Sequence, residues 1–234
     1  MTPEAVQSYP RALYFAAVVA VGTLYRLLFS VRVTGGDNLP PSGPLIVVAN
    51  HLSYFDIPFL GAFLPRPSIF ISKEEVADVP VVGWLLDTFG TVILRRGQSD
   101  RRAIRHSLGV LENGDLLVIF PEGTRSRGDG LLAGQPGVGL LARRSGATMV
   151  TAAVTGTEKI TVRSFFRQRL TLTIGSPVTL EELTPQGRAA NAAEITEALM
   201  RRLAALLPAD YRGYYAAAEG DPTDAVGPAG QVER

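Results

Sequence analysis

The 234-residue chain contains no cysteine. This absence excludes disulfide bonds, thiolate metal sites, a cysteine nucleophile and the capture of an acyl group on a thiol. Lysine and histidine are scarce, since the lysines are Lys73 and Lys159 and the histidines are His51 and His106. Acidic and basic residues nearly balance, 22 against 23, so the chain lacks the positive field expected of a nucleic-acid-binding protein.

Apolar residues, by contrast, are abundant. They make up 46% of the chain, charged residues make up only 19%, and the mean hydropathy is +0.17, which favours contact with a membrane. Residues 12–31 are almost wholly apolar and carry one charge, Arg26. A helix of this length could span a bilayer, but the internal arginine favours a helix that lies in the interface. A spanning helix and a buried core helix remain the alternatives.

Beyond residue 40, short apolar runs alternate with segments of helical periodicity. This alternation predicts an α/β fold with a mostly parallel central sheet flanked by helices. We expect an N-terminal membrane-associating segment at 1–34, one α/β domain at 35–215 and a flexible tail at 216–234. The expected strands are 44–50, 67–72, 91–96, 116–122, 148–157 and 170–180, and the expected helices are 57–64, 81–90, 99–114, 136–146 and 194–207.

His51 is the first candidate for a catalytic group. It directly follows an apolar strand, where open α/β sheets place their sites, and Asp56 comes five residues later. The two side chains can meet if His51 lies in the turn before a helix and Asp56 in its first turn, which would leave Nε2 free to accept a proton. Alternatively, Asp56 only stabilises a helix N-terminus. His106 lies in a charged helical pattern and is expected at the surface.

A second group of polar residues follows the strand at 116–122. Gly123 permits a backbone geometry that a side chain would block, Thr124 offers a hydroxyl, and Arg125 offers a fork suited to phosphate. Glu122 could orient Arg125 or bind a substrate hydroxyl. The alternative is an ordinary turn with a surface arginine.

Two further cations lie at the ends of predicted strands, Lys73 directly after 67–72 and Arg96 as the last residue of 91–96. The carboxyl ends of parallel strands meet at one edge of a sheet, so these cations can converge with Arg125 on one anion. Histidines and carboxylates show no metal-ligand spacing, so we expect no metal site.

These motifs together resemble the glycerol-phosphate and lysophosphatidate acyltransferase family, of the bacterial 1-acylglycerol-3-phosphate acyltransferase type. The resemblance rests on five blocks between residues 35 and 160. They are NHLSYFD with its His-x4-Asp spacing, SKEEVADVPVVGWLL, GTVILRR, IFPEGTRS and, more weakly, TAAVTGTEK.

The resemblance implies a role for each matching residue. His51 would be the general base and Asp56 would orient it. The residues that would bind the substrate phosphate are Lys73, Arg96, Glu122, Gly123, Thr124 and Arg125. The domain at 35–215 would then be an acyltransferase domain that makes phosphatidate from lysophosphatidate, with no bound cofactor and with acyl-CoA or acyl carrier protein as the thioester co-substrate.

The same resemblance implies a lysophospholipid acceptor, a membrane surface as partner and a place at the cytoplasmic face of the plasma membrane. Three alternatives to this function remain. Another acceptor, such as glycerol-3-phosphate or another lysolipid, would keep the mechanism. A thioesterase-like hydrolase would replace the acceptor by water, and a catalytically silent lipid-binding protein would not need His51 and Asp56.

Overall fold

The computed structural model describes residues 11–73, 92–94, 100–184 and 190–216. Its centre is a mixed sheet of seven strands in the order β1-β7-β6-β2-β5-β3-β4. Neighbouring strands are parallel except β6 and β7, which are antiparallel. The strands are β1 (Ser30–Thr34), β2 (Leu45–Ala49), β3 (Ser68–Lys73), β4 (Val92–Leu94), β5 (Leu116–Ile119), β6 (Thr148–Thr155) and β7 (Arg169–Ile174).

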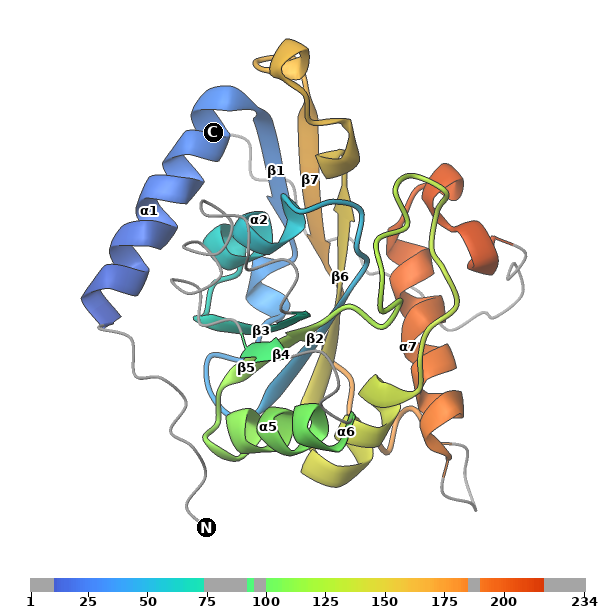
Figure 1. Cartoon of the computed structure of the whole chain (residues 1–234). Coiled ribbons are helices and arrows are strands. Elements are labelled where there is room, and N and C mark those ends of the chain that lie inside the picture. The colour runs from blue at the N-terminus through green and yellow to red at the C-terminus, as the bar shows by residue number, and fades with distance from the viewer. Residues whose placement is uncertain (1–10, 74–91, 95–99, 185–189, 217–234) are drawn as a thin grey trace.

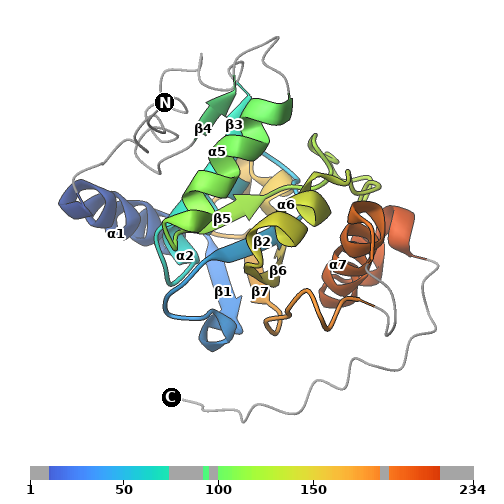
Figure 2. The same cartoon turned by 90° about the horizontal axis from the view of Figure 1, so that it is seen from below.

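Helices cover both faces of this sheet. Helices α1 and α2 lie on one face, and α5, α6 and α7 lie on the other (Figures 1 and 2). The α-helices are α1 (Arg11–Leu28), α2 (Asp56–Phe63), α5 (Asp100–Glu112), α6 (Gly137–Ser145) and α7 (Ala192–Leu206). Short 3₁₀ helices are η1 (Gly36–Asn38), η2 (Thr157–Lys159), η3 (Val162–Ser164), η4 (Ala209–Tyr211) and η5 (Gly213–Tyr215).

The central strand β2 explains why its sequence is continuously apolar. All five of its residues are fully buried, and they alternate between two cores. Leu45 and Val47 pack with α1 and α2, whereas Ile46 and Val48 pack with α5, α6 and α7. A strand covered by helices on both faces has no solvent side, so no polar alternation remains in its sequence.

Helix α1 is apolar on both of its faces. Its inner face packs on α2, where Tyr25 and Phe29 join the core with Phe59 and Phe63. The Tyr25 hydroxyl donates a hydrogen bond to the carbonyl of Phe55 at 2.9 Å, directly before α2. Burial, and to a smaller extent the nearby Asp56 carboxylate, raises the pKa of Tyr25, so this hydroxyl remains a donor.

The outer face of α1 is left in contact with solvent. Leu13, Phe15, Val19, Leu24 and Leu27 are each at least half exposed there. No helix in the described part of the chain is long and apolar enough to cross a membrane. The expected membrane association of this helix therefore remains a prediction, and the spanning alternative finds no support.

The expected alternation of strands and helices is confirmed as an α/β fold with a mixed sheet. Each of the six predicted strands is present, but β1 was missed because its residues continue the apolar run of α1, which ends at Leu28 rather than near residue 31. The helix expected at 81–90 and nearly all of the tail expected at 216–234 lie outside the described residues.

Candidate active site

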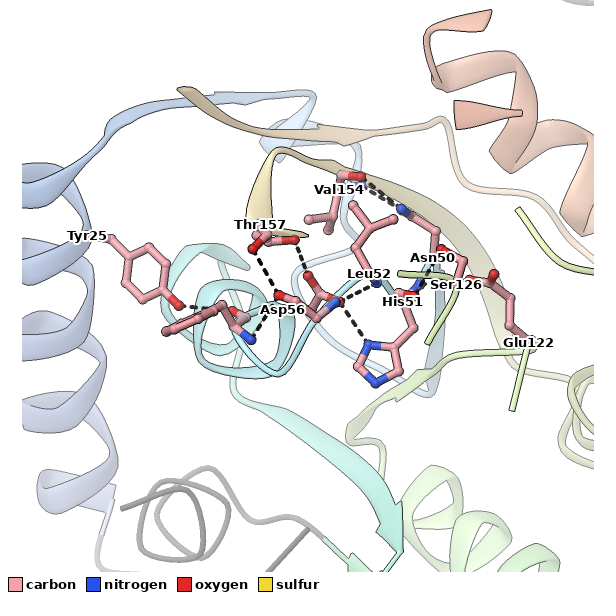
Figure 3. Close-up of polar contacts among 11 residues, drawn as sticks. Tyr25, Asn50, His51, Leu52, Asp56, Glu122, Ser126, Val154 and Thr157 are labelled. Atoms are coloured by element: carbon pink, nitrogen blue, oxygen red, sulfur yellow. Dashed lines mark hydrogen bonds and ion pairs between the residues drawn. The ribbon is translucent and has the colours of Figure 1, made fainter. Parts of the chain in front are cut away.

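The candidate site lies at the carboxyl ends of three adjacent strands of the sheet. His51 follows β2, Phe120 and Glu122 follow β5, and Thr157 follows β6 (Figure 3). Because these strands are parallel, their carboxyl ends meet at one edge. Residues far apart in the sequence are thereby brought within hydrogen-bonding distance.

His51 and Asp56 form the centre of the site. Helix α2 begins at Asp56 and His51 lies in the turn before it, and Nδ1 of His51 is 2.8 Å from Oδ2 of Asp56. The Asp56 side chain is fully buried, whereas the His51 ring is 16% exposed. An ionised carboxylate can only accept hydrogen bonds, so Nδ1 is the donor and Nε2 carries the free lone pair.

The Asp56 carboxylate is fixed by three further donors. Its Oδ2 accepts hydrogen bonds from the backbone amides of Leu52 at 2.6 Å and Ser53 at 2.8 Å. Its Oδ1 accepts a hydrogen bond from the hydroxyl of Thr157. Asp56 therefore fixes the loop before α2 and contacts the histidine at the same time. It also lies in the first turn of α2, where the helix dipole favours a carboxylate, so the two interpretations of this residue are compatible.

The imidazole and backbone of His51 are held by the loop after β5. The ring stacks on Phe120 with 4.2 Å between centroids and an interplanar angle of 20°. The amide of His51 donates to Oε1 of Glu122 at 2.7 Å, and its carbonyl accepts from the amide of Ser126 at 2.8 Å. These contacts fix the position of the ring independently of a substrate.

Glu122 is a buried anchor between two loops. Its Oε1 accepts from the amide of His51, and its Oε2 accepts from the amide of Leu132 at 2.9 Å. Burial raises the pKa of Glu122, and the hydrogen bonds from the two amides act in the opposite direction. Glu122 thus contacts the backbone of His51, whereas the expected orientation of Arg125 is provided by Tyr54.

We expect Glu122→Gln to lower both stability and activity. The glutamine side chain has only one oxygen, and its NH₂ group faces one of the two backbone amides that Glu122 accepts from. That amide loses its acceptor, which costs about 1–3 kcal/mol in the free energy of unfolding. Urea denaturation and turnover of the variant would measure this effect. Glu181→Gln, at an exposed glutamate, is the matched control. An unchanged denaturation midpoint and rate for Glu122→Gln would contradict the anchoring role.

The other residues of this loop lie closer to solvent. Gly123 has φ of 68°, in the left-handed region that glycine adopts without strain, and Thr124 is exposed. The Arg125 guanidinium stacks 3.6 Å from the centre of the Tyr54 ring and donates to its hydroxyl at 2.9 Å. A pocket of about 230 Å³ lies there, with Arg125, Arg127 and Glu158 among its lining residues.

The remaining expected ligands are only partly described. Lys73 ends β3 at the same edge of the sheet as the carboxyl ends of β2 and β5, while Arg96 lies outside the described residues. In the described ranges, no group of three or more histidine or carboxylate side chains could hold a metal ion.

Three contributors to the site were missed from the sequence. Thr157 ends a predicted strand and Phe120 lies near the end of another, so the rule that strand ends converge could have identified them. Asn50 is buried at the end of β2, where its side chain donates to the carbonyl of Val154 and accepts from its amide. It thereby pairs β2 with β6 directly before His51, and no sequence pattern signals this contact.

Comparison with known proteins identifies the family. The family model described as Acyltransferase matches residues 30–155, which is more than half of the chain. The chain belongs to the acyltransferase family. The resemblance predicted from the five sequence blocks is thereby confirmed.

Relatives within the acyltransferase family differ in their named substrates. The chain is 46% identical over 106 residues to a lyso-ornithine lipid O-acyltransferase of Pseudomonas aeruginosa. The aligned region covers 45% of this chain and 39% of that protein. It is 32% identical over 162 residues to a 1-acyl-sn-glycerol-3-phosphate acyltransferase of Saccharomyces cerevisiae, covering 66% of this chain and 53% of that protein. The chain therefore spans about two fifths to about half of the length of these curated relatives.

A solved acyltransferase shares the fold of this chain. The crystal structure of the 1-acyl-sn-glycerophosphate acyltransferase PlsC from Thermotoga maritima matches with a TM-score of 0.65 and 26% identity. The match covers 86% of this chain and 83% of that one. The likeness thus extends over almost the whole architecture and not only over the motif blocks.

Proposed function

We propose that this acyltransferase moves a fatty acyl group from acyl-CoA or acyl carrier protein to the free hydroxyl of lysophosphatidate, giving phosphatidate. The observation that carries the proposal is the His51–Asp56 pair, with Nδ1 of His51 held at 2.8 Å by a buried carboxylate and Nε2 left as acceptor. An imidazole fixed in this tautomer is suited to take a proton from a hydroxyl.

The proposed reaction needs no acyl-enzyme. Nε2 of His51 removes the proton of the acceptor hydroxyl as its oxygen attacks the thioester carbonyl. When the tetrahedral intermediate collapses, the carbon–sulfur bond breaks and the thiolate takes the proton back from the imidazolium. The Asp56 carboxylate stabilises the imidazolium in between. Because the chain has no cysteine, direct transfer also agrees with its composition.

The proposed acceptor phosphate binds beside the loop that carries His51. Arg125 and Arg127 line the pocket there, and a planar guanidinium can bind phosphate oxygens in pairs. Lys73 and Arg96 would add further charge, with Gly123 and Thr124 in the same loop as Arg125. Glu122 would support this group through the backbone of His51.

We propose that α1 holds the enzyme at a membrane surface, at the cytoplasmic face of the plasma membrane. Its outer face exposes Leu13, Phe15, Val19, Leu24 and Leu27, and such a patch fits an interfacial helix. In this arrangement the lipid substrates reach the site from the layer in which they reside.

A lyso-ornithine lipid is the second candidate acceptor. It is favoured by the 46% identity to the Pseudomonas aeruginosa enzyme. Glu158, which lines the pocket with Arg125 and Arg127, adds a carboxylate that could face the ammonium group of an amino-acid headgroup. Both acceptors present a free hydroxyl, so the same His51 chemistry serves either of them.

Thiol release from acyl-CoA by the purified protein tests the proposal. We expect release only when lysophosphatidate is present, together with an equal amount of phosphatidate detected by mass spectrometry. Arg125→Ala should raise KM for this acceptor by roughly 10- to 100-fold, the loss expected for a charge-assisted hydrogen bond. Arg144→Ala, at an exposed arginine of α6, is the matched control.

Other outcomes of this assay would overturn parts of the proposal. Release without any acceptor would identify a hydrolase. Release with a lyso-ornithine lipid but not with lysophosphatidate would replace the acceptor and keep the mechanism. If neither acceptor supports transfer from acyl-CoA or acyl carrier protein, the enzymatic proposal fails.

A further inference from the structure

The connection between β6 and β7 carries an exposed apolar tip. It contains η3, and it projects beside the end of α1 in the upper part of Figure 1. Val162 is 83% exposed and Phe166 is 75% exposed, the two highest values among the large hydrophobic residues that the structure describes. Folding does not account for either side chain, because neither is buried.

The tip is nevertheless built as a defined structure. Thr161 and Ser164 form a capping box, in which the Thr161 amide donates to Oγ of Ser164 at 2.8 Å. Phe165 turns inward and packs edge-on against Phe29 with 5.6 Å between centroids. The amide of Phe166 donates to the carbonyl of Leu28 at 2.6 Å, which ties the tip to the end of α1.

Phe166 adopts a backbone conformation that disfavours its side chain. Its φ is 66°, in the left-handed region that residues other than glycine, asparagine and aspartate rarely enter. Such a conformation is strained and persists only where the surrounding structure holds it. A strained residue that points a large aromatic ring into water is explained if the ring has a binding partner outside the protein.

The charges around the tip indicate which partner. Residues 161–169 contain Arg163, Arg167 and Arg169 and no acidic residue, although the net charge of the whole chain is only +1. The preceding Lys159 lies outside this range and is paired with Glu158. The three arginines are exposed. Aromatic and aliphatic side chains among cations match an anionic lipid bilayer, where a basic residue near the surface contributes about 1 kcal/mol.

The tip also lies at the end of α1 that carries exposed leucines. Leu24 and Leu27 of that face are 52% and 66% exposed, and Leu28 accepts the hydrogen bond from Phe166. We propose that residues 161–167 form a second bilayer contact, in which Val162 and Phe166 enter the interface and Arg163 and Arg167 bind the phosphates of anionic lipids. This inference extends the membrane role proposed for α1 and does not depend on the identity of the acceptor.

Spin labels on single introduced cysteines test the contact directly, since the chain has none of its own. We expect nitroxides at Val162→Cys and Phe166→Cys to lose accessibility to an aqueous nickel chelate when vesicles of phosphatidylglycerol are added. A label at Tyr214→Cys, an exposed aromatic position in η5, should keep it. Val19→Cys reports on α1 separately.

Two variants test the roles of charge and ring by vesicle sedimentation. Arg163→Ala with Arg167→Ala should weaken partitioning onto phosphatidylglycerol vesicles by roughly 30-fold, since two basic contacts are lost. Arg143→Ala with Arg144→Ala changes the charge equally on α6 and should have little effect. Phe166→Gly should weaken binding while leaving the denaturation midpoint unchanged or higher, because glycine adopts this φ without strain.

Distinct results would overturn the inference. If labels at 162 and 166 stay in water while the label at 19 becomes shielded, α1 is the contact and the tip is not. Shielding of the tip labels without vesicles would indicate a contact with protein. Equal losses of vesicle binding for both arginine pairs would indicate that only the overall charge of the protein attracts it to the vesicles. Turnover of dispersed short-chain substrates should be unchanged in the tip variants, so a failed membrane contact and a failed catalytic proposal give different results.

Discussion

Replacing His51 by alanine should lower kcat for acyl transfer by about 10²–10⁴-fold, the usual contribution of a positioned general base. The variant lacks the imidazole whose Nδ1 is held by Asp56 and whose Nε2 is free to take the hydroxyl proton. The fold should persist, because the backbone amide of His51 still donates to Glu122 and its carbonyl still accepts from Ser126. Turnover with saturating acceptor, measured beside urea denaturation, checks both statements.

His106→Ala is the matched control for this experiment. It removes the other histidine, which lies on α5 at the opposite face of the sheet from α2. The sequence predicts His106 at the surface, but the structure places it only partly exposed, with Nε2 buried. We expect its turnover to stay within a few-fold of the parent enzyme. Near-parental turnover of His51→Ala would show that His51 is not the base.

Substitutions of Asp56 should separate charge from geometry. In Asp56→Asn, the amide oxygen can occupy the place of Oδ2 and accept from Leu52 and Ser53, while the NH₂ group can donate to Thr157. The His51 tautomer is then kept and only the negative charge is lost. We expect kcat to fall by roughly 10²-fold with little loss of stability, because the imidazolium loses its counter-charge.

Asp56→Ala should affect stability much more strongly. It leaves two backbone amides, the Thr157 hydroxyl and the His51 ring without their acceptor in a buried site. The expected loss is about 3–5 kcal/mol in the free energy of unfolding, the cost of removing one partner of a buried charged network. Equal stability of the Asn and Ala variants would contradict the view that Asp56 organises the loop before α2.

Much of this site could be predicted from the sequence because it follows strand order. The apolar runs marked six of the seven strands, and polar residues at their ends were expected to converge. The spacing of His51 and Asp56 gave a geometric condition, a turn followed by a first helical turn, and the structure meets it. Their catalytic roles stay predictions that the variants above test.

Other features could not be predicted because they depend on tertiary contacts. Strand β1 begins inside the apolar run 12–31, and pairing with β7 is what makes its residues extended. The sequence pattern of β7 does not show its direction either, because alternation does not distinguish parallel from antiparallel pairing. The motif around Glu122 predicts an exposed side chain that binds substrate. In the structure Glu122 is only 4% exposed and accepts hydrogen bonds from two backbone amides.

The inner face of α1 limits how the membrane contact proposed for this helix can be removed. Deletion of residues 1–29 would remove Tyr25 from the rings of Phe59 and Phe63 and Phe29 from the same core. It would also remove the hydrogen bond to Phe55, next to Asp56. A shortened protein would thus lose both core packing and support for the loop that holds Asp56. Removing the proposed membrane contact calls instead for polar replacements on the outer face, at positions such as Leu13, Val19 and Leu27, with the helix itself retained.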